Sequence, residues 1–208
     1  MSAMSRRPID VGEPPQDAER PDESELLVRH RNGDAHAFAE LVARYGGPIY
    51  GYLARCGLDA SARDDVFQEV FAAIHRGVDS YQPDRPVRPW VFAIAANIVR
   101  SHYRATRVRE IALPTGSSTG HGDTVPDGYQ LAEARETAAW MERAIAALPL
   151  AQREVVVLCC IEQLAQSDVA TTLGMPLSTV KTHLRRARMT LAQALARRRA
   201  NQRREVST

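Results

Sequence analysis

Seven hydroxyl and basic side chains near the carboxyl end have the types and spacing needed to bind DNA. They follow Gly174-Met175-Pro176, a segment typical of a tight turn between two helices. On a helix after this turn, their hydroxyl and cationic groups would suit contacts with phosphates and with base edges in the major groove. The first two could also cap that helix. The candidate DNA-binding residues are Ser178, Thr179, Lys181, Thr182, Arg185, Arg186 and Arg188.

The residues around this turn indicate a helix-turn-helix. Ala170 is small enough for close helix contact, Gly174 can adopt a left-handed conformation, and Val180 would pack between the two helices. Ala165 stands where a capping hydroxyl is expected on the first helix, so that helix lacks a side-chain cap. The alternative is a structural helical hairpin with an exposed basic face.

A second set of polar residues is expected on one face of a helix between Asp59 and Gly77. Val66, Val70 and Ile74 recur at helical spacing and would be buried. The opposite stripe is uncharged or acidic, so it cannot favour DNA but can bind basic side chains of a partner protein. A solvated helix face is the alternative. The candidate partner-binding residues are Asp65, Gln68 and Glu69.

A third set lies on the next predicted helix, which runs from Val87 towards Arg107. Val91, Ile94 and Ile98 give this helix an apolar face, and its basic and polar side chains lie away from that face. For Trp90, periodicity favours a place in the core, and stacking on a base is the alternative. The residues of this candidate surface are Trp90, Asn97, Arg100, Ser101 and Arg104.

Charge is unevenly distributed along the 208 residues. The formal net charge is only +2, from 27 basic and 25 acidic residues, yet residues 176–204 hold nine basic residues and no acidic one. The rest of the chain therefore carries −7. This division suggests two partners, namely nucleic acid at the basic end and a protein with a basic surface elsewhere. A basic tail on a solvated helix is the alternative.

Composition excludes several other classes of protein. No apolar run exceeds the seven residues of Val155–Ile161, whereas a bilayer span needs about 20, and no signal-peptide pattern opens the chain. We therefore expect a cytoplasmic protein without membrane insertion. Three cysteines without CxxC spacing argue against a disulfide scaffold or zinc ribbon. Asp64-Asp65, Glu69 and His75 would lie on two helix faces, so we expect no metal, no cofactor and no enzymatic activity.

Helical periodicity, broken by turn signals, predicts an all-α fold of two small helical domains joined by a flexible linker, the second containing the helix-turn-helix. The first domain is predicted to contain a break at Gly46-Gly47, with Pro48 opening a new helix. Eleven of the fifteen residues from Pro114 to Gly128 are Gly, Ser, Thr or Pro, which is typical of a linker. The predicted parts are a disordered arm (1–21), a first domain (22–109), a flexible linker (110–132), a second domain (133–199) and a basic tail (200–208).

Four sequence blocks, in this order along the chain, carry a resemblance to a known family. With them the chain resembles a bacterial sigma factor of the extracytoplasmic-function (ECF) type, the sigma-70 family subunit that gives RNA polymerase its promoter specificity. It departs from the family at Ala165-Gln166, where Ser-Tyr is usual, and at His183, where arginine is frequent. The blocks are Asp64–Phe71, Arg88–Asn97, Ala147–Val155 and Leu173–Arg188.

The resemblance implies a role for each candidate surface. Residues 22–109 would be sigma region 2, whose acidic stripe binds the clamp helices of the largest subunit of core RNA polymerase. The helix with Asn97 and the Tyr81–Arg88 loop would melt and read the −10 element. Residues 133–199 would be region 4, which grips the −35 element as duplex. The resemblance also implies an anti-sigma factor.

Two alternatives remain at this point. A helix-turn-helix transcriptional regulator that is not a polymerase subunit would need only the second domain's motif and a dimer surface. For Asn97, the amide could read the edge of an extruded base, or it could merely bond the Tyr81–Arg88 loop.

Overall fold

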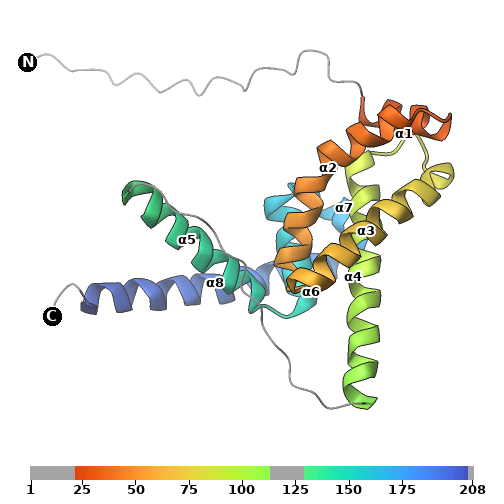
Figure 1. Ribbon diagram of the computed structural model, residues 1–208. Helices are drawn as coiled ribbons and strands as arrows, with labels where there is room; N and C mark the ends of the chain where they lie inside the picture. The colour runs from red at the N-terminus through yellow and green to blue at the C-terminus, as the bar shows by residue number, and fades with distance from the viewer. Residues whose placement is uncertain (1–21, 113–128, 206–208) are drawn as a thin grey trace, which may run out of the picture.

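The computed structural model describes residues 22–112 and 129–205, and no strand occurs among them. The first part of the chain forms α1 (Glu23–Arg31), α2 (Ala35–Arg55), α3 (Ala60–Gly77), a 3-10 turn (Val78–Ser80) and α4 (Val87–Ala112) (Figure 1). The second part forms α5 (Tyr129–Ala146), α6 (Leu150–Val156), a π-helical turn (Val157–Ile161), α7 (Gln166–Leu173) and α8 (Leu177–Glu205). The prediction of an all-α fold with two small helical domains is confirmed.

Three predicted segments fall wholly or partly outside the described residues. These are the arm at 1–21, the centre of the linker at 113–128 and the end of the tail at 206–208. The linker was expected to span residues 110–132, whereas α4 continues to Ala112 and α5 begins at Tyr129.

The predicted break at Gly46-Gly47 is wrong, because α2 continues through both glycines and Pro48. Its apolar residues keep helical spacing across this segment, and their burial outweighs the low helix propensity of glycine. Asp34 caps the helix by accepting hydrogen bonds from the backbone N–H groups of His36 (2.9 Å) and Ala37 (3.2 Å). The buried residues of α2 are Ala37, Leu41, Tyr45, Ile49, Tyr52 and Leu53.

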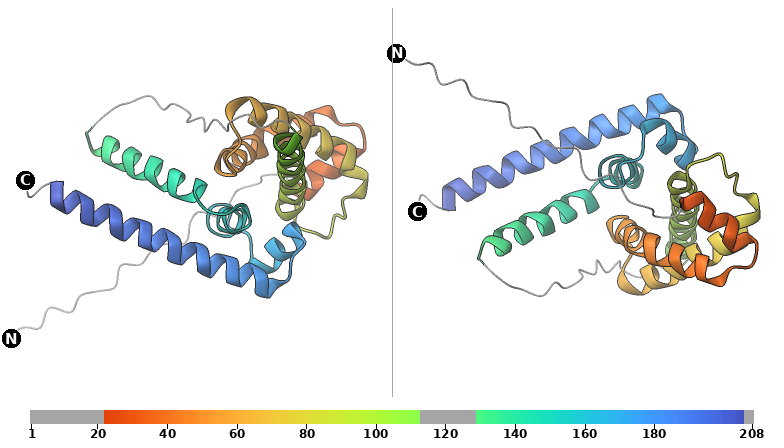
Figure 2. Two further views of the ribbon diagram at one scale, coloured as in Figure 1. Left: turned by 90° about the horizontal axis from the view of Figure 1, so that it is seen from below. Right: turned by 90° about the horizontal axis from the view of Figure 1, so that it is seen from above.

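Helix α4 is packed on two sides, which its sequence pattern did not indicate. Helices α2 and α3 pack on one side of it, and α7 of the second domain packs on the other (Figure 2). Ile94 and Ile98 of the expected apolar face are only half-buried. Ala95 and Ala96 are fully buried, and such small side chains allow close helix contact. The other buried residues of α4 are Val87, Val91, Phe92 and Val99.

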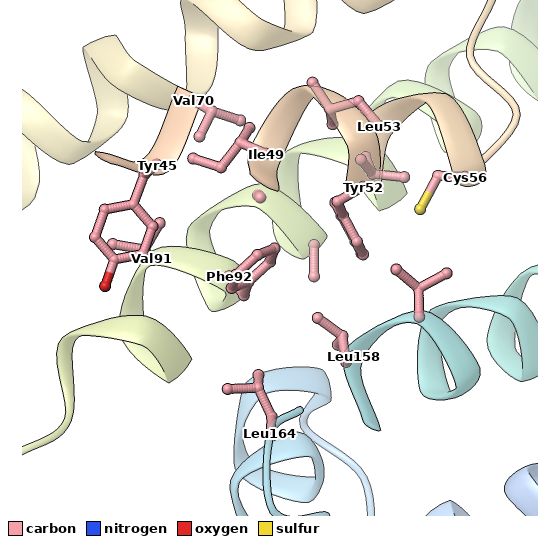
Figure 3. Close-up of a cluster of buried hydrophobic side chains, with 14 of the residues drawn as sticks. Tyr45, Ile49, Tyr52, Leu53, Cys56, Val70, Val91, Phe92, Leu158 and Leu164 are labelled. Atoms are coloured by element: carbon pink, nitrogen blue, oxygen red, sulfur yellow. The ribbon is translucent and has the colours of Figure 1, made fainter. Parts of the chain in front are cut away.

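One hydrophobic core extends through both domains. Tyr52 of α2 and Phe92 of α4 are fully buried, with ring centroids 5.6 Å apart. Leu158 and Leu164 of the second domain point towards this pair (Figure 3). The two domains that the sequence predicts therefore pack directly against each other.

Helices α5 and α8 form an arm that extends away from this core (Figure 2). The Arg198 guanidinium of α8 lies 5.1 Å from the centroid of the Trp140 ring on α5 and 3.2 Å from a carboxylate oxygen of Glu136. The carboxyl half of α8 thus packs on α5. Helix α8 also includes residues 200–205 of the predicted tail.

Replacing Gly46 with alanine tests the continuity of α2. A Cβ at this position would lie 3.8 Å from Cζ of Phe67, an ordinary contact distance. Because glycine inside a helix is less favourable than alanine, we expect Gly46→Ala to stabilise the protein by about 0.5–1 kcal/mol in urea unfolding. A turn at this position would give the opposite result, since alanine is strained where φ is positive.

Candidate nucleic-acid interface

The helix-turn-helix predicted around Gly174 is present. Gly174 ends α7 in the left-handed conformation (φ 60°, ψ 38°), and its N–H donates to the Thr171 carbonyl at 3.1 Å. The N–H of Met175 donates to the Ala170 carbonyl at 3.0 Å, which also satisfies the end of α7. Val180 is fully buried, as its spacing indicates.

The sequence predicted no side-chain cap on the first helix of the motif and a hydroxyl cap on the second, and these two predictions have different outcomes. Ala165 stands at the N-cap of α7 and makes no side-chain hydrogen bond, as expected. Capping of the second helix by Ser178 or Thr179 is wrong, because α8 begins at Leu177. The Pro176 carbonyl accepts from the N–H groups of Thr179 (2.9 Å) and Val180 (3.1 Å). Pro176 therefore precedes the first helical residue, and its backbone carbonyl accepts the first hydrogen bonds of α8.

The amino-terminal half of helix α8 presents lysine and arginine side chains to solvent. Val180, Leu184 and Ala187 form its buried side. Thr179 and Thr182 are half-buried, and the Thr182 hydroxyl donates to the Ser178 carbonyl at 2.9 Å. Such a helix offers cationic donors to phosphates without burying any unpaired charge. The exposed candidates are Ser178, Lys181, Arg185, Arg186 and Arg188.

The acidic stripe of α3 is also open to solvent. Asp65, Gln68 and Glu69 are all exposed, on the side opposite the buried Val66 and Val70. None of the three makes a hydrogen bond or ion pair with the residues that the structure describes. The structure thus leaves these three side chains available to a partner.

The candidate residues of α4 lie in different environments. Asn97, Ser101 and Arg104 are exposed, and no hydrogen bond joins Asn97 to the Tyr81–Arg88 loop, all of which the structure describes. Trp90 is half-buried against the core, with its ring 5.3 Å from that of Tyr81. The Trp90 ring thus packs at the edge of the core, and part of it is exposed to solvent.

Arg100 does not lie on an open surface as expected. Its Nε and Nη2 donate to Oε2 of Glu154 at 3.3 and 3.2 Å, and its Nη1 donates to the Leu173 carbonyl at 2.8 Å. Both partners belong to the second domain. The sequence prediction failed because it considered the faces of α4 alone and not the second domain packed on them.

A second arginine of the first domain has the same kind of partner. Arg88 Nη2 donates to Oε2 of Glu162 at 2.6 Å, and Nε donates to the Glu162 carbonyl at 3.1 Å. Glu154 and Glu162 are only 1% and 5% exposed. Burial raises the pKa of both carboxyl groups, and the Arg100 and Arg88 guanidinium groups act in the opposite direction.

The sequence contained a signal for these pairs that was not used. Glu154 and Glu162 flank an apolar run of seven residues, where a buried charged side chain requires a partner. Two further contacts also join the domains. The Tyr52 hydroxyl donates to Oε1 of Glu154 at 3.4 Å, and Arg153 Nη1 donates to the Cys56 carbonyl.

The remaining candidate chemistry is limited. Among residues 22–112 and 129–205, no three or more His, Cys, Asp or Glu side chains lie close enough together to hold a metal ion. His30 and His75 form a pair, with ring nitrogens 3.0 Å apart. Cys159 is half-buried and Cys160 is exposed, and neither forms a disulfide. No helix in the described part of the chain is long and apolar enough to cross a membrane.

Together, the helix-turn-helix and the exposed basic side of α8 define a helical DNA-binding protein. Residues 41–109 match the family described as Sigma-70 region 2, and residues 138–191 match Sigma-70, region 4. RNA polymerase sigma factor CnrH of Cupriavidus metallidurans is 32% identical over 187 residues, covering 87% of this chain and 96% of CnrH. ECF RNA polymerase sigma factor SigM of Mycobacterium tuberculosis is 32% identical over 173 residues, covering 83% and 84%.

Solved structures show the same relationship. The structure of CnrH in complex with the cytosolic domain of CnrY matches with a TM-score of 0.64 at 28% identity, covering 84% of this chain and 97% of that one. Sigma factor RpoE in complex with anti-sigma factor NepR from Bartonella quintana matches with a TM-score of 0.62, covering 76% and 96%. At 18% identity, RpoE supports the fold alone.

This chain belongs to the sigma-70 family, as an RNA polymerase sigma factor of the ECF type. The resemblance found in the sequence is therefore confirmed. Sigma factors are non-enzymatic and direct promoter-specific initiation of transcription, which argues against the alternative of a regulator that is not a polymerase subunit.

The turn geometry gives a stability prediction. No atom would contact a Cβ at position 174, so Gly174→Ala would be penalised only for its left-handed backbone. We expect a cost of about 1–2 kcal/mol in urea unfolding. Gly174→Asn is the control and should cost less, because asparagine tolerates this conformation better. Equal losses for both variants would contradict backbone conformation as the cause.

Proposed function

We propose that the first domain binds core RNA polymerase and melts and reads the −10 element, while the second domain grips the −35 element as duplex. The protein would do this in the cytoplasm, without a cofactor. The main support is the outer side of α8, where four exposed cations follow a left-handed turn at Gly174 in a region 4 match. Their chemistry suits phosphates and guanine edges in a major groove.

For core polymerase, the proposed surface is the exposed stripe of α3 formed by Asp65, Gln68 and Glu69. It lies within the region 2 match, and its side chains are free of partners in the described part of the protein. Carboxylates on a rigid helix can pair with basic side chains of a partner helix at little conformational cost. The proposed partner is the clamp-helix pair of the largest polymerase subunit.

For the −10 element, the proposed surface is the open side of α4. Asn97, Ser101 and Arg104 are exposed there, and Arg100 joins them once its contacts with the second domain are broken. The amide of Asn97 can donate and accept at once, as recognition of an unstacked base requires. Because no hydrogen bond ties Asn97 to the Tyr81–Arg88 loop, the base-reading role is favoured over the loop-supporting one.

An anti-sigma factor is the proposed regulatory partner. The related sigma factor CnrH, 28% identical to this chain, supports this because it was solved in complex with a partner protein, the cytosolic domain of CnrY. The likeness to CnrH covers nearly all of that chain.

Reversing charges on the α3 stripe tests core binding. We expect Asp65→Arg with Glu69→Arg to weaken association with core polymerase at least tenfold, since like charges would then face the partner. The control is Glu25→Arg with Asp79→Arg, two exposed acidic residues of the same domain that give the same change in charge. Folding stability should change by less than about 0.5 kcal/mol in either variant. Equal binding by both variants in a titration with labelled core would refute the assignment.

Single substitutions on α8 test duplex binding. Lys181→Ala and Arg186→Ala should each weaken binding to −35 duplex. If the lost contact is to a phosphate, the slope of log K against log salt concentration should become shallower by about one unit. A lost base contact instead costs about 1–3 kcal/mol and relaxes specificity at one position. Arg197→Ala is the control, because this exposed arginine lies far along the same helix. Identical salt titrations for all three variants would mean that another face of α8 enters the groove.

A further inference from the structure

Met189 of α8 is an apolar side chain among the basic ones proposed for the −35 element. It is 55% exposed, the highest value for a large hydrophobic residue in the part of the chain that the structure describes. The arginines that precede it on the helix, Arg185, Arg186 and Arg188, are exposed as well. The function proposed above assigns DNA contacts to these cations and leaves Met189 without a role.

The position of Met189 on the helix places it in line with two of the proposed DNA contacts. Lys181, Arg185 and Met189 follow one another at four-residue intervals, so they form one row along the helix. The buried Val180 and Ala187 lie on the far side of α8. A helix that turns Lys181 and Arg185 towards a major groove therefore turns Met189 towards it as well.

A surface hollow of about 400 Å³ joins Met189 to the same cations. Lys181, Arg185 and Arg188 are its charged residues, and Met189 and Leu184 belong to its apolar part. The hollow thus combines cationic groups with apolar surface. This combination matches the edge of a major groove, where phosphates border the groove and the methyl groups of thymine project into it.

We propose that Met189 recognises a thymine of the −35 element by contact with the C5 methyl group of that base. The proposal rests on the function proposed above for α8 and adds a base preference to it. Among the four bases, thymine alone presents a methyl group in the major groove, and apolar side chains contact it there. The side chain of methionine is unbranched and polarisable, so it can adapt its shape to such a group.

The rise of the helix limits where this thymine lies. Met189 is eight residues beyond Lys181, which corresponds to about 12 Å along an α-helix. Successive base pairs are about 3.4 Å apart along a duplex. The thymine should therefore lie within about four base pairs of the position that Lys181 contacts.

Selection from a DNA library tests whether Met189 sets a base preference. Core polymerase is combined with the full-length wild-type chain, with Met189→Ala or with Met141→Ala, and each holoenzyme selects from duplexes randomised across the length of a promoter. Met141 is the control, because it is an exposed methionine on α5, outside the proposed DNA-binding surface. We expect the wild type and Met141→Ala to select the same −35 element, with one thymine that Met189→Ala does not select.

Replacing that thymine with uracil isolates the contribution of the methyl group, since uracil keeps the hydrogen-bonding groups of thymine and lacks only this methyl. We expect the wild-type holoenzyme to bind the uracil duplex about fourfold more weakly than the thymine duplex, the loss expected for one buried methyl group. The Met141→Ala holoenzyme should show the same fourfold difference. The Met189→Ala holoenzyme should bind both duplexes with equal affinity.

Three results would overturn the proposal. A wild-type holoenzyme that binds the thymine and uracil duplexes equally would do so, whether or not the variants fold. The same thymine preference in wild type and Met189→Ala would do so as well. An equal loss of affinity by Met189→Ala on every duplex would mean that Met189 contacts the DNA backbone or the polymerase instead.

The selection also separates this proposal from the function on which it rests. A wild-type holoenzyme that selects no −35 element would contradict the proposed function and this inference together. A selected element whose base preferences do not depend on Met189 would contradict this inference alone.

Discussion

The two-sided burial of α4 is the constraint on which the rest of the structure depends. This helix carries the candidate −10 residues and also supplies Phe92, Ala95, Ala96 and Val99 to the core. Because α2 and α3 cover one side and α7 the other, the orientation of the second domain is set by the same helix that would hold melted DNA. Packing and promoter binding are therefore coupled through one element.

The prediction from sequence succeeded where local pattern decides structure. The turn at Gly174 and the burial of Val180 follow from short-range spacing, and the structure has both. The exposed stripe of α3 follows equally from helical periodicity. Such features depend on neighbours a few residues away, which the sequence displays directly.

The prediction from sequence failed where contacts between residues far apart in the sequence determine the structure. The break expected at Gly46 is absent because the buried stripe of α2 continues across it, and the cost of glycine is small beside that burial. Arg100 was assigned to an open surface because its partner Glu154 lies 54 residues further on. The −10 and −35 assignments rest on family resemblance, since spacing alone identifies cationic faces but not the DNA that they bind.

The arm formed by α5 and α8 has a mechanical consequence. A helix of 29 residues such as α8 is about 43 Å long, and its recognition end lies opposite the end that packs on α5. Helix α5 begins at Tyr129, so the connection from the first domain joins the arm through α5 and not at the helix-turn-helix. A force applied through that connection would therefore act far from the recognition end of α8 and would reach it only through the packing of α5 on α8.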